Sequence, residues 1–152
     1  METTRKKALP FLRQCVDGIS IVTLLLAVGC QHAAPGPADI EPGDICASCK
    51  MAISEKRYAA ELIDRDGELL RFDDIGCMLR WVEGQPHEAT AYFVADFDSR
   101  KWVRAEEAYY VRSPELKTPM SGIVAFQDAS SAEAAAARYH GDRLRLTDLL
   151  GR

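Results

Sequence analysis

Several residue types and motifs that would place this chain in a familiar class are scarce or missing. The 152 residues include three histidines and one CxxC motif, with no second CxxC and no HxxxH spacing. The usual ligand pattern of a structural zinc site is therefore missing. Acidic residues number 23 against 19 basic ones, so no basic surplus points to a nucleic-acid partner. Seven prolines and ten glycines are too few for a collagenous or low-complexity chain.

What is present fits one folded domain of ordinary size. Hydrophobic residues make up 47% of the chain and charged residues 28%, which is enough apolar material for a core. The five cysteines are too many to ignore and too few for a disulfide scaffold. Their positions therefore carry most of the functional information.

Residues 1–29 have the order of a secretory signal peptide. Four basic residues precede an apolar stretch, ISIVTLLLAV, which ends at Gly29 and Cys30. This stretch is shorter than the roughly 20 apolar residues that a transmembrane helix needs. The segment LLLAVGC resembles the lipobox of bacterial lipoproteins, so we expect cleavage before Cys30 and attachment of acyl chains to its side chain. An ordinary signal peptide cut nearby is the alternative.

We divide the chain into three parts. Residues 1–29 are the lipoprotein signal peptide, residues 30–44 are the lipidated cysteine with a flexible tether, and residues 45–152 are the folded domain. Cys15 leaves with the signal peptide, and three cysteines remain in the domain. Three is an odd number, so in an oxidising compartment at least one thiol has no partner within the chain.

The folded domain is predicted to be of the α+β class, built from two tandem ββαβ units. In the first unit, KRYAAELI and ELLRF flank the hairpin signal Asp66-Gly67. The helix IGCMLRWV follows, with Asp73 or Asp74 as its N-cap, and TAYFVADF is a buried strand.

The second unit repeats this order of elements. EAYYVRS and GIVAFQD are strands, and RLRLTDLL begins as a strand. Between them, Ser130 or Ser131 caps an alanine-rich helix that ends at His140-Gly141. The two halves share the order of their elements without strong sequence identity.

The most informative stretch is DICASCKMAI, which places Cys46, Cys49 and Met51 within six residues. A CxxC alone fits a redox dithiol, half of a zinc site or a soft-metal site. In a redox dithiol the CxxC motif is expected at the N-terminus of a helix that follows a strand. In this chain the CxxC motif follows the predicted tether. Thiolates and thioethers select Cu(I), and Cys49 and Met51 point to the same side of an extended segment. The pattern favours a Cu(I) site.

Two further positions bear on this site. Met120 lies in the TPMSG connection before GIVAF, where a loop can hold its side chain toward the N-terminal motif. Cys77 lies on the first helix, and free cysteines are among the most buried residues. Cys77 therefore fits the core, or a position supporting the metal ligands, as well as a ligand role. Core packing is likewise the alternative for Met51 and Met120.

The blocks DICASCKMAI, FDDIGCMLRW, YYVRSPELKTPMSGIVAF and HGDRLRLTDLL occur in this order between Asp44 and Leu150. As a set they resemble the NosL family, the lipoprotein accessory factors of nitrous oxide reductase. The resemblance implies a pair of ββαβ units, related to the fold region of organomercurial lyase. It also implies a Cu(I) chaperone without enzymatic turnover, lipid-anchored at the periplasmic face of a bacterial membrane. The implied partners are nitrous oxide reductase, with its copper–sulfide centre, and an ABC-type maturation complex.

The resemblance also implies a set of ligands. The family's CxM segment falls on Cys49 and Met51 and its TPM segment on Met120, so these three are the implied Cu(I) ligands. Cys46 corresponds to the family's first cysteine. The family glycine after Cys49 is Lys50 here, which makes a turn with positive φ at this position less comfortable.

Two other classes of function remain open from the residues alone. One is an enzyme, either a thiol–disulfide oxidoreductase using Cys46 and Cys49 or an organomercurial-lyase-like enzyme using Cys49, Cys77 and Asp74. Fold analogy gives the lyase little support by itself. The other is a structural lipoprotein whose sulfur residues are core residues.

Overall fold

The computed structural model describes residues 36–85 and 89–151, which belong to one compact body. The predicted signal peptide, Cys15, the predicted lipidation site Cys30 and the first residues of the predicted tether lie outside the described residues. Within the described ranges, no helix has both the length and the apolar character to cross a membrane.

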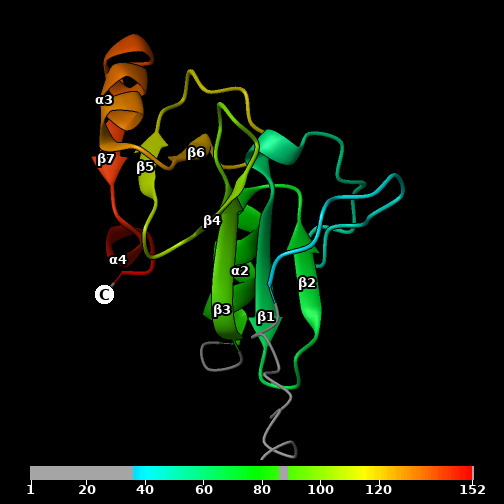
Figure 1. The fold of residues 1–152 in the computed structure, drawn as a ribbon. Coiled ribbons are helices and arrows are strands. Elements are labelled where there is room, and N and C mark those ends of the chain that lie inside the picture. The colour runs from blue at the N-terminus through cyan, green and yellow to red at the C-terminus, as the bar shows by residue number, and fades with distance from the viewer. Residues whose placement is uncertain (1–35, 86–88, 152) are drawn as a thin grey trace, which may run out of the picture. The chain divides into compact units, whose positions relative to one another are not determined.

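The first half of the domain is a four-stranded antiparallel sheet with a helix on one face. Its strands lie in the order β2-β1-β3-β4, and α2 packs against β1 and β2, behind the sheet in the view of Figure 1. The elements are β1 Ala60–Asp64, β2 Leu69–Phe72, α2 Ile75–Gly84, β3 Ala89–Ala95 and β4 Trp102–Arg104.

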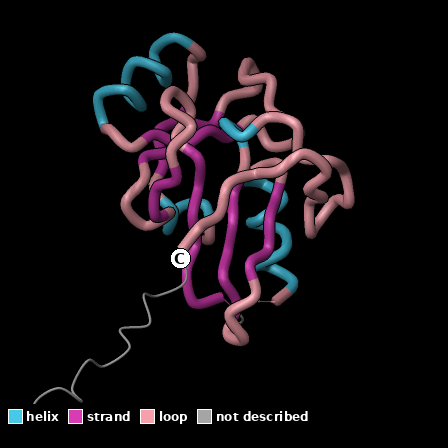
Figure 2. Tube along the Cα trace, turned by 45° about the vertical axis from the view of Figure 1, so that its right-hand side comes forward, coloured by secondary structure: helices cyan, strands magenta, loops and turns pink. Residues whose placement is uncertain are grey.

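The second half is a three-stranded antiparallel sheet in the order β6-β5-β7, with α3 packed against it. In Figure 2 α3 lies at the upper left, near the short strands of the second sheet, and α2 lies at the right, alongside the strands of the first sheet. The elements are β5 Tyr109–Arg112, β6 Ile123–Phe126, α3 Ala129–Arg138, β7 Asp142–Leu144 and α4 Leu146–Leu149.

The prediction of an α+β fold with two tandem ββαβ units is confirmed. The elements β1-β2-α2-β3 and β5-β6-α3-β7 have the same topology, because in each the first strand lies between the other two and pairs antiparallel with both. Strand β4 is an addition that the sequence analysis missed. Its three residues are too few to show the alternation by which strands are recognised.

The turn from the second strand into the helix is also equivalent in the two repeats. Phe72 ends β2 and Asp74 is the N-cap of α2, while Phe126 ends β6 and Asp128 is the N-cap of α3. Both phenylalanines are buried. The two halves therefore share a local sequence, Phe-x-Asp, at the turn between the second strand and the helix.

Two local predictions were wrong. The N-cap of α3 is Asp128, not Ser130 or Ser131, because the backbone is extended at Asp128 and already helical after it. The start of KRYAAELI is a 3-10 helix, η1 (Lys56–Tyr58), and not strand. Charged residues such as lysine are poor strand formers, and β1 begins only at Ala60, where both neighbouring strands can pair with it.

Side chains of β1 alternate between the two faces of the first sheet. Ala60 and Leu62 belong to the main core together with buried residues of α2. Ile63 packs on the other face against Phe93. Glu61, which shares that second face, is a fully buried carboxylate in the centre of the sheet.

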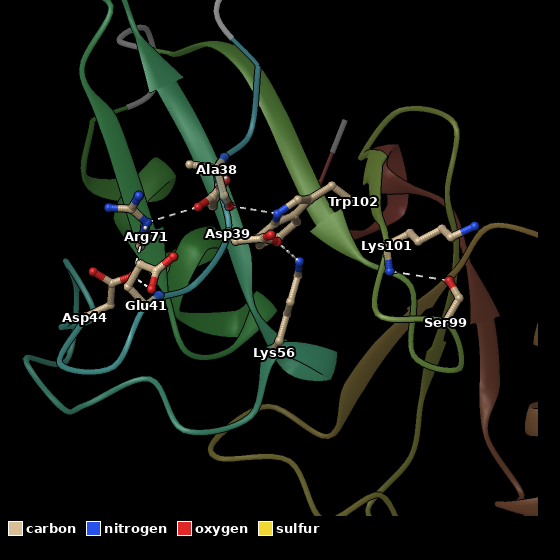
Figure 3. A network of polar contacts seen from close by, with 10 residues as sticks. Ala38, Asp39, Glu41, Asp44, Lys56, Arg71, Ser99, Lys101 and Trp102 are labelled. Carbon is tan, nitrogen blue, oxygen red and sulfur yellow. Dashed lines mark hydrogen bonds and ion pairs between the residues drawn. The ribbon is translucent and has the colours of Figure 1, made fainter.

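A segment that we call the strap, residues 36–44, crosses the first sheet on the face opposite α2 (Figures 1 and 3). The Ala38 N–H donates to Glu61 Oε2 at 3.0 Å, and Trp102 Nε1 donates to the Ala38 carbonyl at 2.8 Å. Lys56 pairs with Asp39. The strap makes up residues 36–44 of the predicted tether, residues 30–44. The contacts of the folded domain therefore extend back to Ala38 in the sequence.

Arg71 connects the strap to the sheet. Its Nε lies 3.2 Å from Glu61 Oε1 and 3.4 Å from Asp44 Oδ2. Even with these partners, burial raises the pKa of Glu61 to about 7, because desolvation outweighs the hydrogen bond from Ala38 and the charge of Arg71. Asp44 immediately precedes the sulfur motif, so this network also fixes where that motif starts.

The raised pKa of Glu61 predicts a pH-dependent stability. Between the ordinary glutamate pKa and about 7 the folded state holds a proton that the unfolded state has lost, so stability falls as pH rises through this window. The loss approaches about 3 kcal/mol at pH 8. In Glu61→Gln the decrease disappears, measured by urea unfolding at pH 5, 6, 7 and 8. Glu68→Gln, an exposed glutamate of the hairpin turn, keeps the wild-type profile; an unaltered profile in Glu61→Gln would refute the assignment.

Candidate metal site

The sulfur motif forms a tight loop whose shape is set by its main chain. Ile45 and Ala52 form an antiparallel bridge across the loop. The Cys46 N–H donates to the Met51 carbonyl at 2.8 Å, and the Lys50 N–H donates to the Cys46 carbonyl at 3.0 Å. Lys50 has a φ of 65°, the left-handed conformation that favours glycine. The loop thus keeps the positive-φ turn despite the lysine, with Lys50 Nζ donating to the Ala47 carbonyl.

The two cysteines of this loop lie side by side. The Cys49 N–H donates to Cys46 Sγ at 3.5 Å. Cys46 is fully buried, whereas Cys49 is partly accessible. The loop is fixed to the sheet by the Ala47 N–H, which donates to the carbonyl of Arg71 at 2.8 Å. The motif therefore lies beside the end of β2.

The turn from β2 into α2 brings further donor atoms to the same place. Cys49 Sγ lies 3.5 Å from Oδ1 and 3.6 Å from Oδ2 of Asp73. Cys77, one turn into α2, is fully buried. One ligand atom each from Cys46, Cys49, Cys77 and Asp73 lies within 4.8 Å of every other. The fold assembles three thiols and a carboxylate, and all three cysteines are free thiols.

A second loop adds a thioether. Met120 Sδ lies 3.6 Å from Cys77 Sγ, and the Met120 side chain is 50% exposed. Arg80, one turn beyond Cys77, places Nη2 3.2 Å from Cys77 Sγ and 2.6 Å from Met120 Sδ. The sulfur atoms thus run from the buried cluster to the protein surface, where a guanidinium covers them.

Asp74 holds the two sides of this site together. As N-cap of α2 its Oδ1 accepts from the Gly76 N–H at 2.7 Å. Its Oδ2 accepts from the N–H groups of Met120 and Ser121 at 3.1 and 3.3 Å. Asp74 is fully buried. One carboxylate therefore ties the helix that carries Cys77 to the loop that carries Met120.

The contact between helix and loop leaves no space for a side chain on Gly76. A Cβ built there would come within 2.4 Å of the Ser121 Cβ and 3.0 Å of Asp74 Oδ1. Gly122, at the end of the loop, has a φ of 66° and lies against the carbonyl of Ser113. The two glycines allow the second repeat to approach the sulfur cluster closely.

Burial raises the pKa of two thiols of the cluster, those of Cys46 and Cys77. Desolvation raises the pKa of Cys46, against hydrogen bonds from backbone N–H groups. Desolvation also raises the pKa of Cys77, and its hydrogen bond to Asp73 adds to this, while Arg80 opposes it. A metal that binds here must displace thiol protons.

The structure places most of the candidate ligands in or next to the thiol cluster, and Met51 is the exception. Cys46 and Cys49 are in the cluster, Met120 contacts it through Cys77, and Cys77 itself contributes a thiol. Met51 contributes its main-chain carbonyl to the loop, while its side chain is 64% exposed. Sequence reasoning did not identify Asp73 or Arg80 as part of the site. The pair Asp73-Asp74 could have indicated a second role, because only one of two adjacent aspartates can be the N-cap of the helix and the other is then available to the site.

Comparison with known families decides the relationship. The NosL family model matches residues 37–151. The chain belongs to the NosL family. A search of curated proteins finds no match. Among solved structures, the chain is similar to the crystal structure of the copper chaperone NosL from Shewanella denitrificans, with 19% identity and a TM-score of 0.69. The match covers 74% of this chain and 94% of that one.

At this identity the similarity to the Shewanella denitrificans NosL shows a shared fold. It covers nearly all of that chain, so both ββαβ repeats belong to the common NosL architecture. The family prediction made from the four sequence blocks is confirmed.

The role of Asp74 predicts a large effect of its removal. Asp74→Ala removes the helix cap and takes the acceptor from the N–H groups of Gly76 and Met120, while the Ser121 N–H keeps Thr118 Oγ1. We expect a loss of about 3 kcal/mol in the free energy of unfolding. Asp73→Ala is the matched control, because the neighbouring carboxylate bonds thiols and not the backbone of α2 or the Met120 loop. Urea unfolding should show at most about 1 kcal/mol of loss in that variant. Equal losses in the two variants would contradict the role given to Asp74.

Proposed function

We propose that this NosL family protein is a Cu(I) chaperone that binds one copper ion and passes it on without enzymatic turnover. The observation that carries the proposal is the convergence of three free thiols at one point of the fold. Thiolates are the donors that Cu(I) prefers. The family match and the copper chaperone name of the similar Shewanella denitrificans structure support the same conclusion.

We assign the thiolates of Cys46, Cys49 and Cys77 as the holding ligands. The exposed thioethers of Met120 and Met51 then serve as exchange ligands at the surface. A thioether is neutral and is not lost into a disulfide, so it suits a ligand that binds and releases copper in an oxidising compartment. Met120, within 3.6 Å of Cys77 Sγ, offers a path from the buried thiols to a partner.

The geometry gives less support to a thiol–disulfide oxidoreductase. Such an enzyme needs an accessible cysteine with a lowered pKa. Cys46, the first cysteine of the CxxC, is fully buried and its pKa is raised. The motif lies in a loop and not at the start of a helix. Holding a metal fits these properties better than attacking a disulfide.

The proposal extends to the location of the protein and to its client. The leader sequence and its lipobox-like end support export and lipid anchoring through Cys30 at the periplasmic face of a bacterial membrane. The resemblance to accessory factors of nitrous oxide reductase supports delivery to the copper–sulfide centre of that enzyme, with an ABC-type maturation complex as docking partner.

A copper titration tests the ligand assignment. The reduced protein should take up one Cu(I) in competition with bicinchoninate, with sulfur as the nearest shell in X-ray absorption. Each of Cys46→Ser, Cys49→Ser and Cys77→Ser should weaken binding by more than the roughly 10–100-fold that loss of a supporting residue costs. Met120→Leu and Met51→Leu should slow the transfer of copper to bicinchoninate more than they change the affinity, because the exchange path is lost.

Met78→Leu is the matched control for these variants. Met78 is the buried neighbour of Cys77 on α2 and belongs to the core, and leucine has a similar volume. It should bind copper as the wild type does. Unchanged affinity in all three cysteine variants would defeat the proposed site.

A cell experiment tests location and client together. In a strain that makes nitrous oxide reductase, Cys30→Ala should move the protein from the membrane fraction to the soluble periplasmic fraction. Cys49→Ser should stay in the membrane fraction and lower the copper content of the reductase. A reductase filled normally in the Cys49→Ser strain would rule out this client.

A further inference from the structure

Arg80 is the charged side chain at the surface of the sulfur cluster, and its hydrogen bonds go to sulfur atoms. Its Nη2 lies 3.2 Å from Cys77 Sγ and 2.6 Å from Met120 Sδ. Sulfur is a weak acceptor, whereas a guanidinium presents N–H donors in a fork that matches a carboxylate. No ion pair among the described residues includes Arg80. The described chain therefore leaves its capacity to bind a carboxylate unused.

Arg112 is a second arginine in the same condition. It is the last residue of β5, and its side chain is exposed. Within residues 36–85 and 89–151, no carboxylate forms an ion pair with it. Arg80 and Arg112 line one hollow of about 320 Å³ beside Met120, where Glu83 is ion-paired with neither of them. Two cations thus lie next to the exposed thioether, although acidic residues outnumber basic ones in the chain, 23 to 19.

Met120 also borders a second hollow, of about 410 Å³. The two hollows share Arg112, Met120 and Ser121 among their lining residues. A buried leucine lines each of them, Leu79 in the first and Leu116 in the second. A peptide segment that extends from one hollow into the other therefore passes the half-exposed side chain of Met120 and both arginines.

We propose that these two hollows bind an extended acidic segment of the protein that receives the copper. Carboxylates of the segment pair with Arg80 and Arg112, and a sulfur or imidazole side chain between them reaches Met120. Charge complementarity selects this occupant, because unpaired guanidinium groups prefer carboxylates and repel a basic surface. The proposal rests on the copper function proposed above and names the chemistry of the partner at the same site.

Pairing with a carboxylate also uncovers the sulfur atoms. A single nitrogen of Arg80, Nη2, contacts both Cys77 and Met120, so the guanidinium covers the exposed end of the cluster. A hydrogen bond between two charged groups is stronger than one to a neutral sulfur. A partner carboxylate therefore draws the guanidinium away from Met120. Recognition of the partner and exposure of the thioether become one event.

Two synthetic peptides test the binding surface, acetyl-EMEEME-amide and acetyl-KMKKMK-amide, which carry the same methionines and opposite charges. Each is titrated into the full-length, reduced, copper-free protein and followed by ¹H–¹⁵N NMR. The acidic peptide should shift the resonances of Arg80, Arg112, Met120 and Ser121, and the basic peptide should not. Raising NaCl from about 0.05 to about 0.5 M should weaken binding of the acidic peptide at least about threefold, because salt screens exposed charges.

Variants of the two arginines identify the contacts. Arg80→Gln and Arg112→Gln should each weaken binding of the acidic peptide about three- to fivefold, and the double variant about tenfold or more. Arg65→Gln is the matched control, because Arg65 is an exposed arginine that lines neither hollow. It should bind the peptide as the wild type does. Circular dichroism reports the folding of each variant.

Copper transfer tests the uncovering step. A saturating concentration of the acidic peptide should raise the rate at which the copper-loaded wild type gives Cu(I) to bicinchoninate, because Arg80 then leaves Met120. In Arg80→Gln the rate should be high without the peptide and should respond little to it. A peptide-dependent rise of the same size in Arg80→Gln would overturn the uncovering role of this arginine.

The remaining outcomes decide the occupant. Equal binding of the two peptides, or wild-type affinity in the folded double variant, would overturn the proposal. So would self-association that Arg80→Gln abolishes in sedimentation, which assigns the hollows to a second copy of the chain. Shifts produced by phosphatidylglycerol vesicles and not by the acidic peptide would overturn it in favour of a membrane surface.

The experiment separates this proposal from the copper function. Peptide binding is measured on the copper-free protein, so it can succeed where Cu(I) uptake fails. Failure of Cu(I) uptake with intact peptide binding would refute the chaperone function and leave an acidic-segment site. Normal Cu(I) uptake without peptide binding would refute the proposed surface alone.

Discussion

The arrangement of the whole site depends on the hydrogen bonds that the Asp74 carboxylate accepts from both repeats. One of its oxygens caps α2, and the other accepts two N–H groups from the Met120 loop. A buried carboxylate is stable only where its acceptors are satisfied, so the loop has few alternative positions. The spacing between the sulfur atoms of Cys77 and Met120 is a result of this constraint.

The strap and the sulfur loop form a second, continuous support. Arg71 bonds the strap residue Asp44 and the sheet residue Glu61 with its side chain, while its carbonyl accepts from Ala47 in the loop. The same residue therefore fixes both the approach to the motif and the motif itself. Rigid placement matters for a metal site, because ligand atoms must converge before the metal binds.

The sequence predicts what depends on local patterns. The hairpin at Asp66-Gly67, a cap at Asp73 or Asp74 and the doubled ββαβ order follow from turn residues, helix spacing and alternation, and the structure has Asp74 as the cap. The presence of Asp73 and Arg80 in the site follows instead from where distant segments meet. The Met51 side chain is largely exposed to solvent, which the spacing of Cys49 and Met51 in the sequence does not predict.

The two repeats share their topology but not the side chains that form the thiol cluster. The β6-to-α3 turn has the same Phe-x-Asp sequence as the β2-to-α2 turn, yet Gln127 stands at the position of Asp73 and Ser131 at the position of Cys77. Single substitutions at these positions would not create a second thiol cluster, because the segment between β4 and β5, residues 105–108, contains no cysteine. The second repeat therefore supplies the loop that packs against the thiol cluster of the first repeat, and the described chain has one such cluster.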